Sequence, residues 1–339
     1  MDGRIELENR YNNNINNLLA KEPEYLKRFN VYMSADDKTA KTKLNYINNV
    51  LRFVNYLKEQ GMDISDEKKL RSINVNDVRL YLQMDDTRMI NKRGKISDSY
   101  KYLRYFSLNC FMKFLEDEEV LDRNFIHKIK TPSNERQKKK VYLNVDEVKE
   151  IEKNVRCGIV NRKAGYILQW KERDEAIICL GFQTALRVSA IISINMENIN
   201  WEEKCLSVIE KGNKMRHVYL GENTLTALEN WIVKRNEFMN KRGFDTPALF
   251  ISRKCRRISA QTVGNILRAY AGEINNGKRI VAHTMRSSTG TNTYLKTKDV
   301  RAAQMVLGHK SLAVTQRYIN STVEQQKELV NEIENLYAE

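Results

Sequence analysis

Apolar side chains recur at intervals of three and four through residues 36–130, which is the spacing of one face of a helix. The clearest series ends before Gly61, a residue suited to closing a helix. A shorter helix is predicted to begin at the N-cap Asn76, and residues 85–95 are predicted to form a charged loop. Ser97 is predicted to cap a long helix with an aromatic-rich buried face. The pattern therefore predicts a small all-helical domain.

The second half of the chain, residues 143–320, combines helical patterns with one pair of strands. An alternating run from Cys205 to Ile209, a Gly-Asn turn and a return from Met215 to Leu220 predict a β-hairpin. Helical patterns surround this hairpin, and they are predicted to follow the cap residue Asn144 and to lie near residues 173–183, 223–240 and 260–270, the last of these after Ser259. The pattern predicts a domain that is mainly α-helical with a small β-sheet.

Both ends of the chain lie outside these two domains. Residues 1–35 are polar and Asn-rich, with one helix predicted from Glu6 to Leu19, and they form an N-terminal extension too short for a domain of its own. Residues 321–339 contain an amphipathic segment from Ser321 to Tyr337. Two interpretations of that segment stay open, a helix packed on its own domain and a helix exchanged with a neighbouring copy.

Residues 131–142 form a basic stretch between the two domains. Pro132 and the density of charge predict an exposed linker. One interpretation is a solvated tether. The second is a segment that follows a phosphate backbone while the two domains clamp a duplex. This second interpretation makes five basic residues candidate DNA contacts, four in the linker and one in the hairpin turn: Arg136, Lys138, Lys139, Lys140 and Lys214.

Composition supports a polyanionic partner. The 339 residues contain 58 Lys and Arg against 43 Asp and Glu, a net charge of +15, so nucleic acid is the first candidate and a generic basic surface the alternative. The length provides for two domains, and no targeting peptide or membrane-spanning run is apparent, so the sequence predicts a soluble intracellular protein. The five cysteines lack metal-ligand spacing, so no metal or cofactor is expected.

The stretch from Val281 to Ile319 concentrates the candidate chemistry. It holds two of the four histidines, His283 and His309, together with Arg286 and Tyr318. Attack of a phenol on a phosphodiester requires donors for the phosphate oxygens and a hydroxyl that forms a covalent ester. The stretch therefore predicts that Tyr318 is presented to a DNA phosphate. Taken alone, Tyr318 is one of 16 tyrosines beside an apolar pattern, and a structural role is the alternative.

Four motifs, in this order, resemble those of the tyrosine site-specific recombinases, or phage-type integrases. The resemblance covers about residues 40–320, and both order and spacing fit. The matching segments are Thr184-Ala185-Leu186-Arg187-Val188-Ser189-Ala190, Lys211-Gly212-Asn213-Lys214-Met215-Arg216, His283-Thr284-Met285-Arg286, and Leu307-Gly308-His309 with Tyr318 following.

The resemblance implies a two-domain architecture in which a helical, SAM-like core-binding domain and a mixed α/β catalytic domain form a C-shaped clamp on DNA. It implies a site-specific recombinase that acts through a 3′-phosphotyrosyl intermediate and a Holliday junction, without metal or ATP. The implied partners are double-stranded DNA with paired sites and a homotetramer assembled on it from free monomers. An accessory DNA-bending or directionality factor is a further possible partner. The implied location is the nucleoid in a prokaryotic cytoplasm.

The resemblance also assigns roles to the motif residues. Arg187 and Arg286 each present a planar fork to the scissile phosphate, and Tyr318 attacks phosphorus. Lys211, at the hairpin tip, protonates the departing 5′-oxygen as general acid, with its basic neighbour Lys214 as the alternative.

The two histidines complete the assigned set. His283 takes or orients the tyrosine proton, and His309 donates a hydrogen bond to a non-bridging oxygen of the phosphate.

Three positions depart from the family pattern. Ala190 stands where an acid is common, so another residue must orient the neighbouring groups. Ala185 replaces a glycine, and Ser287 replaces a histidine. These departures favour an integrase or transposase of a mobile element over a Xer-like resolvase. A type IB topoisomerase-like enzyme and a catalytically silent DNA-binding protein also stay open as interpretations of the motifs.

Overall fold

The computed structural model of the chain describes residues 2–94, 96–132, 141–159, 170–210, 214–275, 278–309, 311–312 and 315. The chain divides into two compact units. The amino-terminal unit comprises Arg4–Gln137, and the carboxy-terminal unit comprises Lys138–Glu339 with Met1–Gly3. This division falls within the stretch predicted to be a linker. The segment 321–339, predicted as the C-terminal helix, lies outside the described residues.

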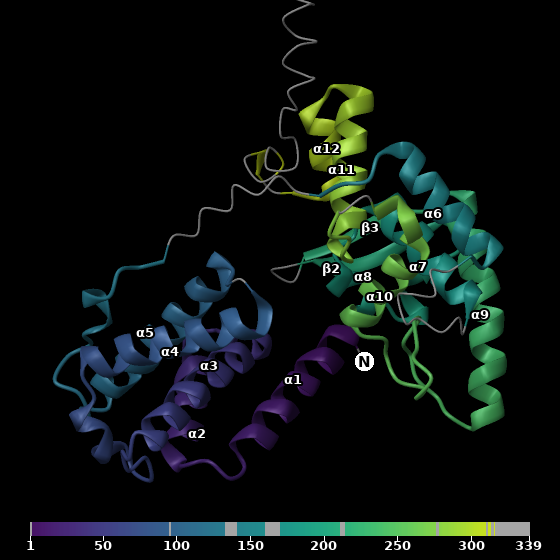
Figure 1. Cartoon of the computed structure of the whole chain (residues 1–339). Helices are drawn as coiled ribbons and strands as arrows, with labels where there is room; N and C mark the ends of the chain where they lie inside the picture. Colours follow the sequence, from purple (N-terminus) through teal and green to yellow (C-terminus); the bar gives the residue numbers. More distant parts are fainter. Residues whose placement is uncertain are drawn as a thin grey trace, which may run out of the picture. The chain divides into compact units, whose positions relative to one another are not determined.

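The amino-terminal unit is all-helical (Figure 1). Its buried core is rich in aromatic rings; those of Phe29 and Phe111 lie 5.2 Å apart between centroids, as do those of Phe53 and Tyr81. Its elements are α1 (Gly3–Leu19), α2 (Glu24–Ala35), α3 (Ala40–Glu59), η1 (Glu67–Ser72), α4 (Val75–Arg93), α5 (Asp98–Asp117) and η2 (Ile126–Lys128).

The predicted boundary at residue 36 is wrong, because α1 and α2 belong to the same core as α3 and α5. Ile15, Phe29 and Met33 are each completely buried within the same cluster as Phe53 and Phe111. Burying these side chains together removes apolar surface from water, which is the main favourable contribution to folding. Residues 1–35 are therefore not a separate extension, and all but the first three belong to the amino-terminal unit.

The charged loop predicted at residues 85–95 is also wrong, because α4 continues to Arg93. The two acids that suggested a loop are paired inside the fold: the Arg104 guanidinium, only 3% exposed, lies 2.5 Å from Asp85 and 2.6 Å from Asp86. The helix begins two residues earlier than predicted, with a capping box formed by Asn74 and Asp77 instead of a cap at Asn76.

The carboxy-terminal unit surrounds a small antiparallel sheet with helices, and its strands lie in the order β1-β2-β3 (Figure 1). The sheet comprises β1 (Ile199–Asn200), β2 (Cys205–Glu210) and β3 (Lys214–Tyr219). The helices are α6 (Val145–Cys157), α7 (Lys171–Thr184), α8 (Val188–Ser193), η4 (Met196–Asn198), α9 (Glu222–Arg242), α10 (Ala260–Ala271), η5 (Gly272–Asn275), α11 (His283–Thr297) and α12 (Val300–Leu307).

The predicted hairpin and the predicted caps Ser97 and Asn144 are confirmed. β2 and β3 pair from Cys205 opposite Tyr219 to Glu210 opposite Lys214. The side chains of Ser97, Asn144 and Ser259 each accept a backbone N–H at the start of a helix. The short edge strand β1 was not predicted, because two residues carry no alternating pattern.

Two glycines let the helices of this unit approach closely. A Cβ added at Gly181 of α7 would lie 2.4 Å from the Met285 sulfur on α11. A Cβ at Gly290 of α11 would lie 2.7 Å from a Leu307 methyl on α12. The three helices are therefore held at fixed separations, which places the ends of α7 and α12 beside α11. Across the described ranges, no helix has the length and apolar character needed to cross a membrane.

Candidate active site

Arg286 links three of the predicted motifs. This α11 residue is 1% exposed, and its guanidinium donates to the Ala185 carbonyl at 2.6 Å and to the Leu307 carbonyl at 2.5 Å. Ala185 lies two residues before Arg187, and Leu307 lies two residues before His309. A single guanidinium has five N–H donors in a planar fork, so it can bridge two chain segments and retain donor capacity. The structure thus brings together the segments that carry Arg187, Arg286 and His309.

A left-handed turn delivers Arg187 to this site. Helix α7 ends at Thr184, and Ala185 follows with φ 52° and ψ 22°. Arg187 then has extended backbone angles and is the N-cap residue of α8. Ala185 occupies the position where the resembling motif has glycine, and glycine adopts such positive φ values without steric cost. Ala185 therefore adopts a left-handed backbone conformation that glycine would adopt at lower steric cost.

His309 follows directly from the end of α12. Gly308 adopts a left-handed conformation, with φ 61°, and its backbone N–H donates to the helix carbonyls of Gln304 and Met305. The His309 ring is 8% exposed, and its Nδ1 lies 3.0 Å from the Thr315 hydroxyl. This contact fixes the orientation of the imidazole, and no motif or spacing in the sequence points to Thr315.

His283 is the first residue of α11 and is exposed, one helical turn before the buried Arg286. The spacing of three residues places both side chains on the same face of the helix. The His-x-x-Arg motif therefore combines a buried cation with an accessible imidazole at a helix start.

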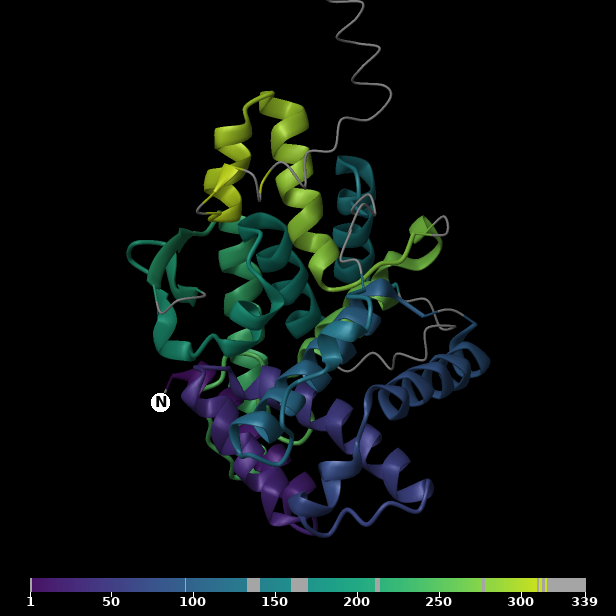
Figure 2. The ribbon, with the colours of Figure 1, turned by 90° about the vertical axis from the view of Figure 1, so that its left-hand side faces the viewer.

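The β2–β3 hairpin lies beside α12 (Figure 2), and Arg216 of β3 joins it to the end of that helix. Its Nη2 donates to the Met305 carbonyl at 3.0 Å and to the Val306 carbonyl at 3.1 Å. Arg286 donates to the next carbonyl, that of Leu307. Two guanidinium groups thus donate hydrogen bonds to three successive carbonyls at the end of this helix. Arg216 belongs to one of the four motifs, but no role was predicted for it.

The carboxyl end of the predicted linker is anchored to α11. The Ser287 hydroxyl donates to the Val141 carbonyl at 2.7 Å, and the Ser288 hydroxyl accepts the Leu143 N–H at 2.9 Å. The Asn292 amide donates to the Leu143 carbonyl at 3.0 Å. Ser287, where the family pattern commonly has histidine, therefore holds the chain where it enters the carboxy-terminal unit.

Ala190 lies nearly buried on α8 and has no carboxylate to offer. The segment after it is held by Arg257, whose guanidinium donates to the Ile192 and Ile194 carbonyls, both at 3.0 Å. Arg257 is 3% exposed and lies far from every motif in the sequence, so spacing alone could not identify it.

Several predicted site residues lie outside the described residues. They are Lys211, Tyr318, Arg136, Lys138, Lys139 and Lys140. The backbone of Lys214 pairs with Glu210 at the start of β3, and the side chain of Lys214 is not among the described ones.

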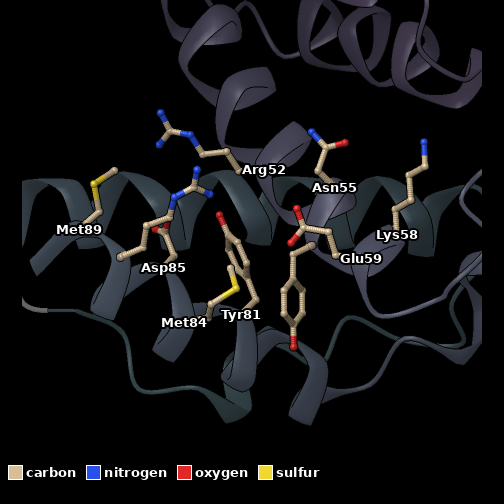
Figure 3. A pocket seen from close by; sticks show the side chains of 10 residues that line it. Arg52, Asn55, Lys58, Glu59, Tyr81, Met84, Asp85 and Met89 are labelled. Carbon is tan, nitrogen blue, oxygen red and sulfur yellow. The ribbon is translucent and has the colours of Figure 1, made fainter. Parts of the chain in front are cut away.

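The amino-terminal unit contains a groove of about 470 Å³ between α3 and α4. Figure 3 shows its lining side chains, among them Arg52, Asn55 and Lys58 of α3 and Tyr81 and Met84 of α4. Arg88 supplies a further cation to the lining, and Glu59 and Asp85 supply carboxylates. The described residues that line this groove all belong to α3 and α4.

Comparisons with known proteins show the family to which this chain belongs. Residues 142–325 match the model of the phage integrase family. The tyrosine recombinase XerC of Caldanaerobacter subterraneus is 29% identical over 331 residues, which cover 92% of this chain and 87% of that protein.

Two solved structures share the fold. The XerH recombinase in a post-cleavage complex with palindromic difH has a TM-score of 0.63 at 18% identity, covering 88% of this chain and 82% of that one. The lambda integrase tetramer on a Holliday junction has a TM-score of 0.58 at 17% identity, covering 87% of this chain and 76% of that one.

The chain has a helical unit followed by a mainly helical unit with a three-stranded sheet. In the second unit, Arg286 connects two other motif segments. This fold and this site are those of a tyrosine recombinase. The chain belongs to the phage integrase family of tyrosine recombinases, and its activity is site-specific cleavage and rejoining of DNA.

Proposed function

We propose that Tyr318 is the nucleophile of this recombinase. Its phenolic oxygen bonds to the scissile phosphorus while the bond to the 5′-oxygen breaks, which leaves a 3′-phosphotyrosyl link. His283 takes or orients the phenolic proton, and Lys211 gives a proton to the departing 5′-oxygen. The new ester conserves the phosphodiester bond energy, so a 5′-hydroxyl can reverse the reaction without ATP.

Arg187, Arg286 and His309 bind the non-bridging oxygens of the same phosphate. The observation that carries this assignment is the Arg286 guanidinium, which donates to Ala185 at 2.6 Å and Leu307 at 2.5 Å. These contacts hold the backbone segments that lead into Arg187 and His309. The side chains of Arg187, Arg286 and His309 are therefore positioned relative to one another by the same two hydrogen bonds. Donors fixed in place before the reaction stabilise the charge that develops in the transition state.

Double-stranded DNA is the substrate, and the basic linker follows its backbone. Val141 and Leu143 are bonded to α11, the helix that carries His283 and Arg286. The linker cations Arg136, Lys138, Lys139 and Lys140 precede Val141 by one to five residues in the sequence. In the amino-terminal unit, Arg52, Lys58 and Arg88 beside the groove of Figure 3 supply further cations.

The working assembly is a tetramer of this chain on paired sites, in which strands exchange through a Holliday junction. In this assembly, the amphipathic segment from Ser321 to Tyr337 is exchanged with a neighbouring copy of the chain. An accessory DNA-bending or directionality factor and a location at the nucleoid in the cytoplasm complete the proposal. The biological role is integration or transposition of a mobile element, with Xer-like resolution as the second candidate because XerC is among the relatives.

A plasmid carrying two copies of a candidate site, cut from the DNA that flanks this gene, tests the proposal. The wild-type protein should delete the intervening segment as a circle, and Tyr318→Phe should bind the plasmid without deleting it. Relaxation of any supercoiled plasmid, with or without sites, would indicate a topoisomerase. Binding without either reaction by the wild-type protein would indicate a silent DNA-binding protein.

A further inference from the structure

Lys211 lies between β2 and β3 in the sequence, and the hairpin of these two strands is held at its base by contacts within the sheet. Ile199 pairs with Leu206, Asn200 pairs with Cys205, and the Leu220 N–H donates to the Lys204 carbonyl at 2.8 Å. From this base, β2 and β3 run toward the turn as a two-stranded ribbon. A two-stranded ribbon is marginally stable by itself. The orientation of β2 and β3 beyond this base therefore depends on the contacts that the two strands make with neighbouring elements.

Arg216 provides such a contact, on the tip side of the base. It lies opposite Val208 in the ladder, with only the pairs Ile209–Met215 and Glu210–Lys214 between it and the turn. At about 3.4 Å per residue, it lies roughly 7 Å along β3 from Lys214, where the strand begins. Its guanidinium is half-buried and donates to the Met305 and Val306 carbonyls.

The contact is electrostatically favourable, because the last carbonyls of a helix carry a partial negative charge. The same helix end passes through Gly308 to His309, and its Leu307 carbonyl accepts from Arg286. One chain segment, residues 305–309, thus joins the hairpin to two residues proposed to bind the phosphate.

We propose that Arg216 is a positioning residue that docks the hairpin against the end of α12, so that the Lys211 ammonium reaches the departing 5′-oxygen. The inference rests on the proposed role of Lys211 as general acid. It predicts a loss concentrated in leaving-group protonation, because Arg286 and the turn at Gly308 still hold residues 307–309 when Arg216 is removed. A displacement of about 1 Å at a reacting group is enough to reduce a rate by about 10²-fold.

The test compares two substrates at the same cleavage site, one with the ordinary 5′-oxygen and one with a bridging 5′-sulfur. In both, the phenolic oxygen bonds to phosphorus as the bond to the leaving atom breaks. An alkoxide leaving group requires a proton, whereas a thiolate leaves without one because thiols are far more acidic. Single-turnover cleavage should be about 10²-fold slower for Arg216→Ala on the oxygen substrate and close to wild type on the sulfur substrate.

Companion variants keep the result interpretable. Lys211→Ala should show the same selective recovery on sulfur, and the double variant should be no slower than Lys211→Ala alone. Arg216→Lys, which retains one donor group, should recover part of the rate. Arg301→Ala removes an exposed cation from the first turn of α12 without touching these carbonyls, and it should cleave both substrates at the wild-type rate.

Three outcomes would overturn the inference. Wild-type rates for Arg216→Ala on both substrates would show that the contact has no role, and the function proposed above would stand. Equal losses on both substrates would place the effect of Arg216 at the phosphate or in folding. If Lys211→Ala itself stayed slow on sulfur, the general-acid role and the inference would fall together, while adduct formation by Tyr318 would remain to support the nucleophile.

Discussion

Arg286 combines a structural and a chemical role in one buried side chain. Replacing it by alanine leaves the carbonyls of Ala185 and Leu307 without their charged donor. We expect Arg286→Ala to lower the free energy of unfolding by about 2–4 kcal/mol, because buried groups lose hydrogen bonds to a charge. Urea unfolding measures this change, and single-turnover cleavage should fall by about 10²–10³ as well.

Arg187 provides the contrast, since its side chain is half-buried at the start of α8. Arg187→Ala should show a similar loss of cleavage with a smaller loss of stability. Equal losses of stability in the two variants would contradict the bridging role assigned to Arg286.

Ala185 tests whether the left-handed turn is required at this site. Ala185→Gly relieves about 1 kcal/mol of backbone strain but loses a buried methyl worth about 0.8 kcal/mol, so stability should change by less than about 1 kcal/mol. Ala185→Val adds a β-branched side chain at φ 52°, in a position that is fully buried. It should cost more than about 2 kcal/mol and slow cleavage, as urea unfolding and cleavage assays would show.

At the scale of elements, the separation of α11 and α12 depends on Gly290. A methyl group there collides with Leu307, whose carbonyl accepts from Arg286. We expect Gly290→Ala to cost about 1–3 kcal/mol and to slow cleavage, because the end of α12 must move. Thermal unfolding and single-turnover rates measure the two effects.

Gly264 is the matched control for Gly290, since it lies in the interior of α10. A Cβ there would find its nearest neighbours at 3.6 Å and 3.7 Å, which is ordinary contact. Gly264→Ala should therefore stabilise the protein by about 0.5–1 kcal/mol through helix propensity. A gain in stability for Gly290→Ala would contradict the close packing of α11 on α12.

Helix and strand boundaries were predicted correctly where a short local pattern or a single capping residue determines them. The hairpin followed from alternation and a Gly-Asn turn, and the caps Ser97 and Asn144 followed from their side chains. Residues 85–93 are helical against the prediction because their carboxylates are satisfied by Arg104, which lies 18 and 19 positions away. No local rule includes such a partner.

The candidate site shows the same division. The motif residues were identifiable because their order and spacing are specific. The contacts of Arg216, Arg257 and Ser287 were not predictable, because each donates to a backbone carbonyl more than 60 positions away in the chain. Every residue has a backbone carbonyl, so the sequence does not indicate which carbonyl a side chain contacts. Only the folded structure shows it.

At the scale of the whole molecule, the linker should contribute to the salt dependence of DNA binding. The slope of log K against log salt falls by about 0.9 for each phosphate that the protein no longer neutralises. Replacing Lys138, Lys139 and Lys140 together by alanine should therefore lower that slope by up to about three and weaken binding at low salt. Fluorescence anisotropy at several salt concentrations measures the slope.

Lys204 is the control for the linker, because its ammonium pairs with Glu222 at 2.5 Å. Lys204→Ala removes one positive charge and should leave the slope unchanged. An unchanged slope in the triple linker variant would mean that the linker is a solvated tether and makes no contact with the duplex.

The central claim is that the candidate active site presents Tyr318 to a DNA phosphate. The most direct measurement incubates nicked duplexes from the DNA flanking this gene with the wild-type protein and with Tyr318→Phe, and detects SDS-resistant protein–DNA adducts. We expect an adduct with the wild-type protein alone, attached through Tyr318. An adduct that persists in Tyr318→Phe, or its absence from every nicked duplex that the wild-type protein binds tightly, would contradict the claim.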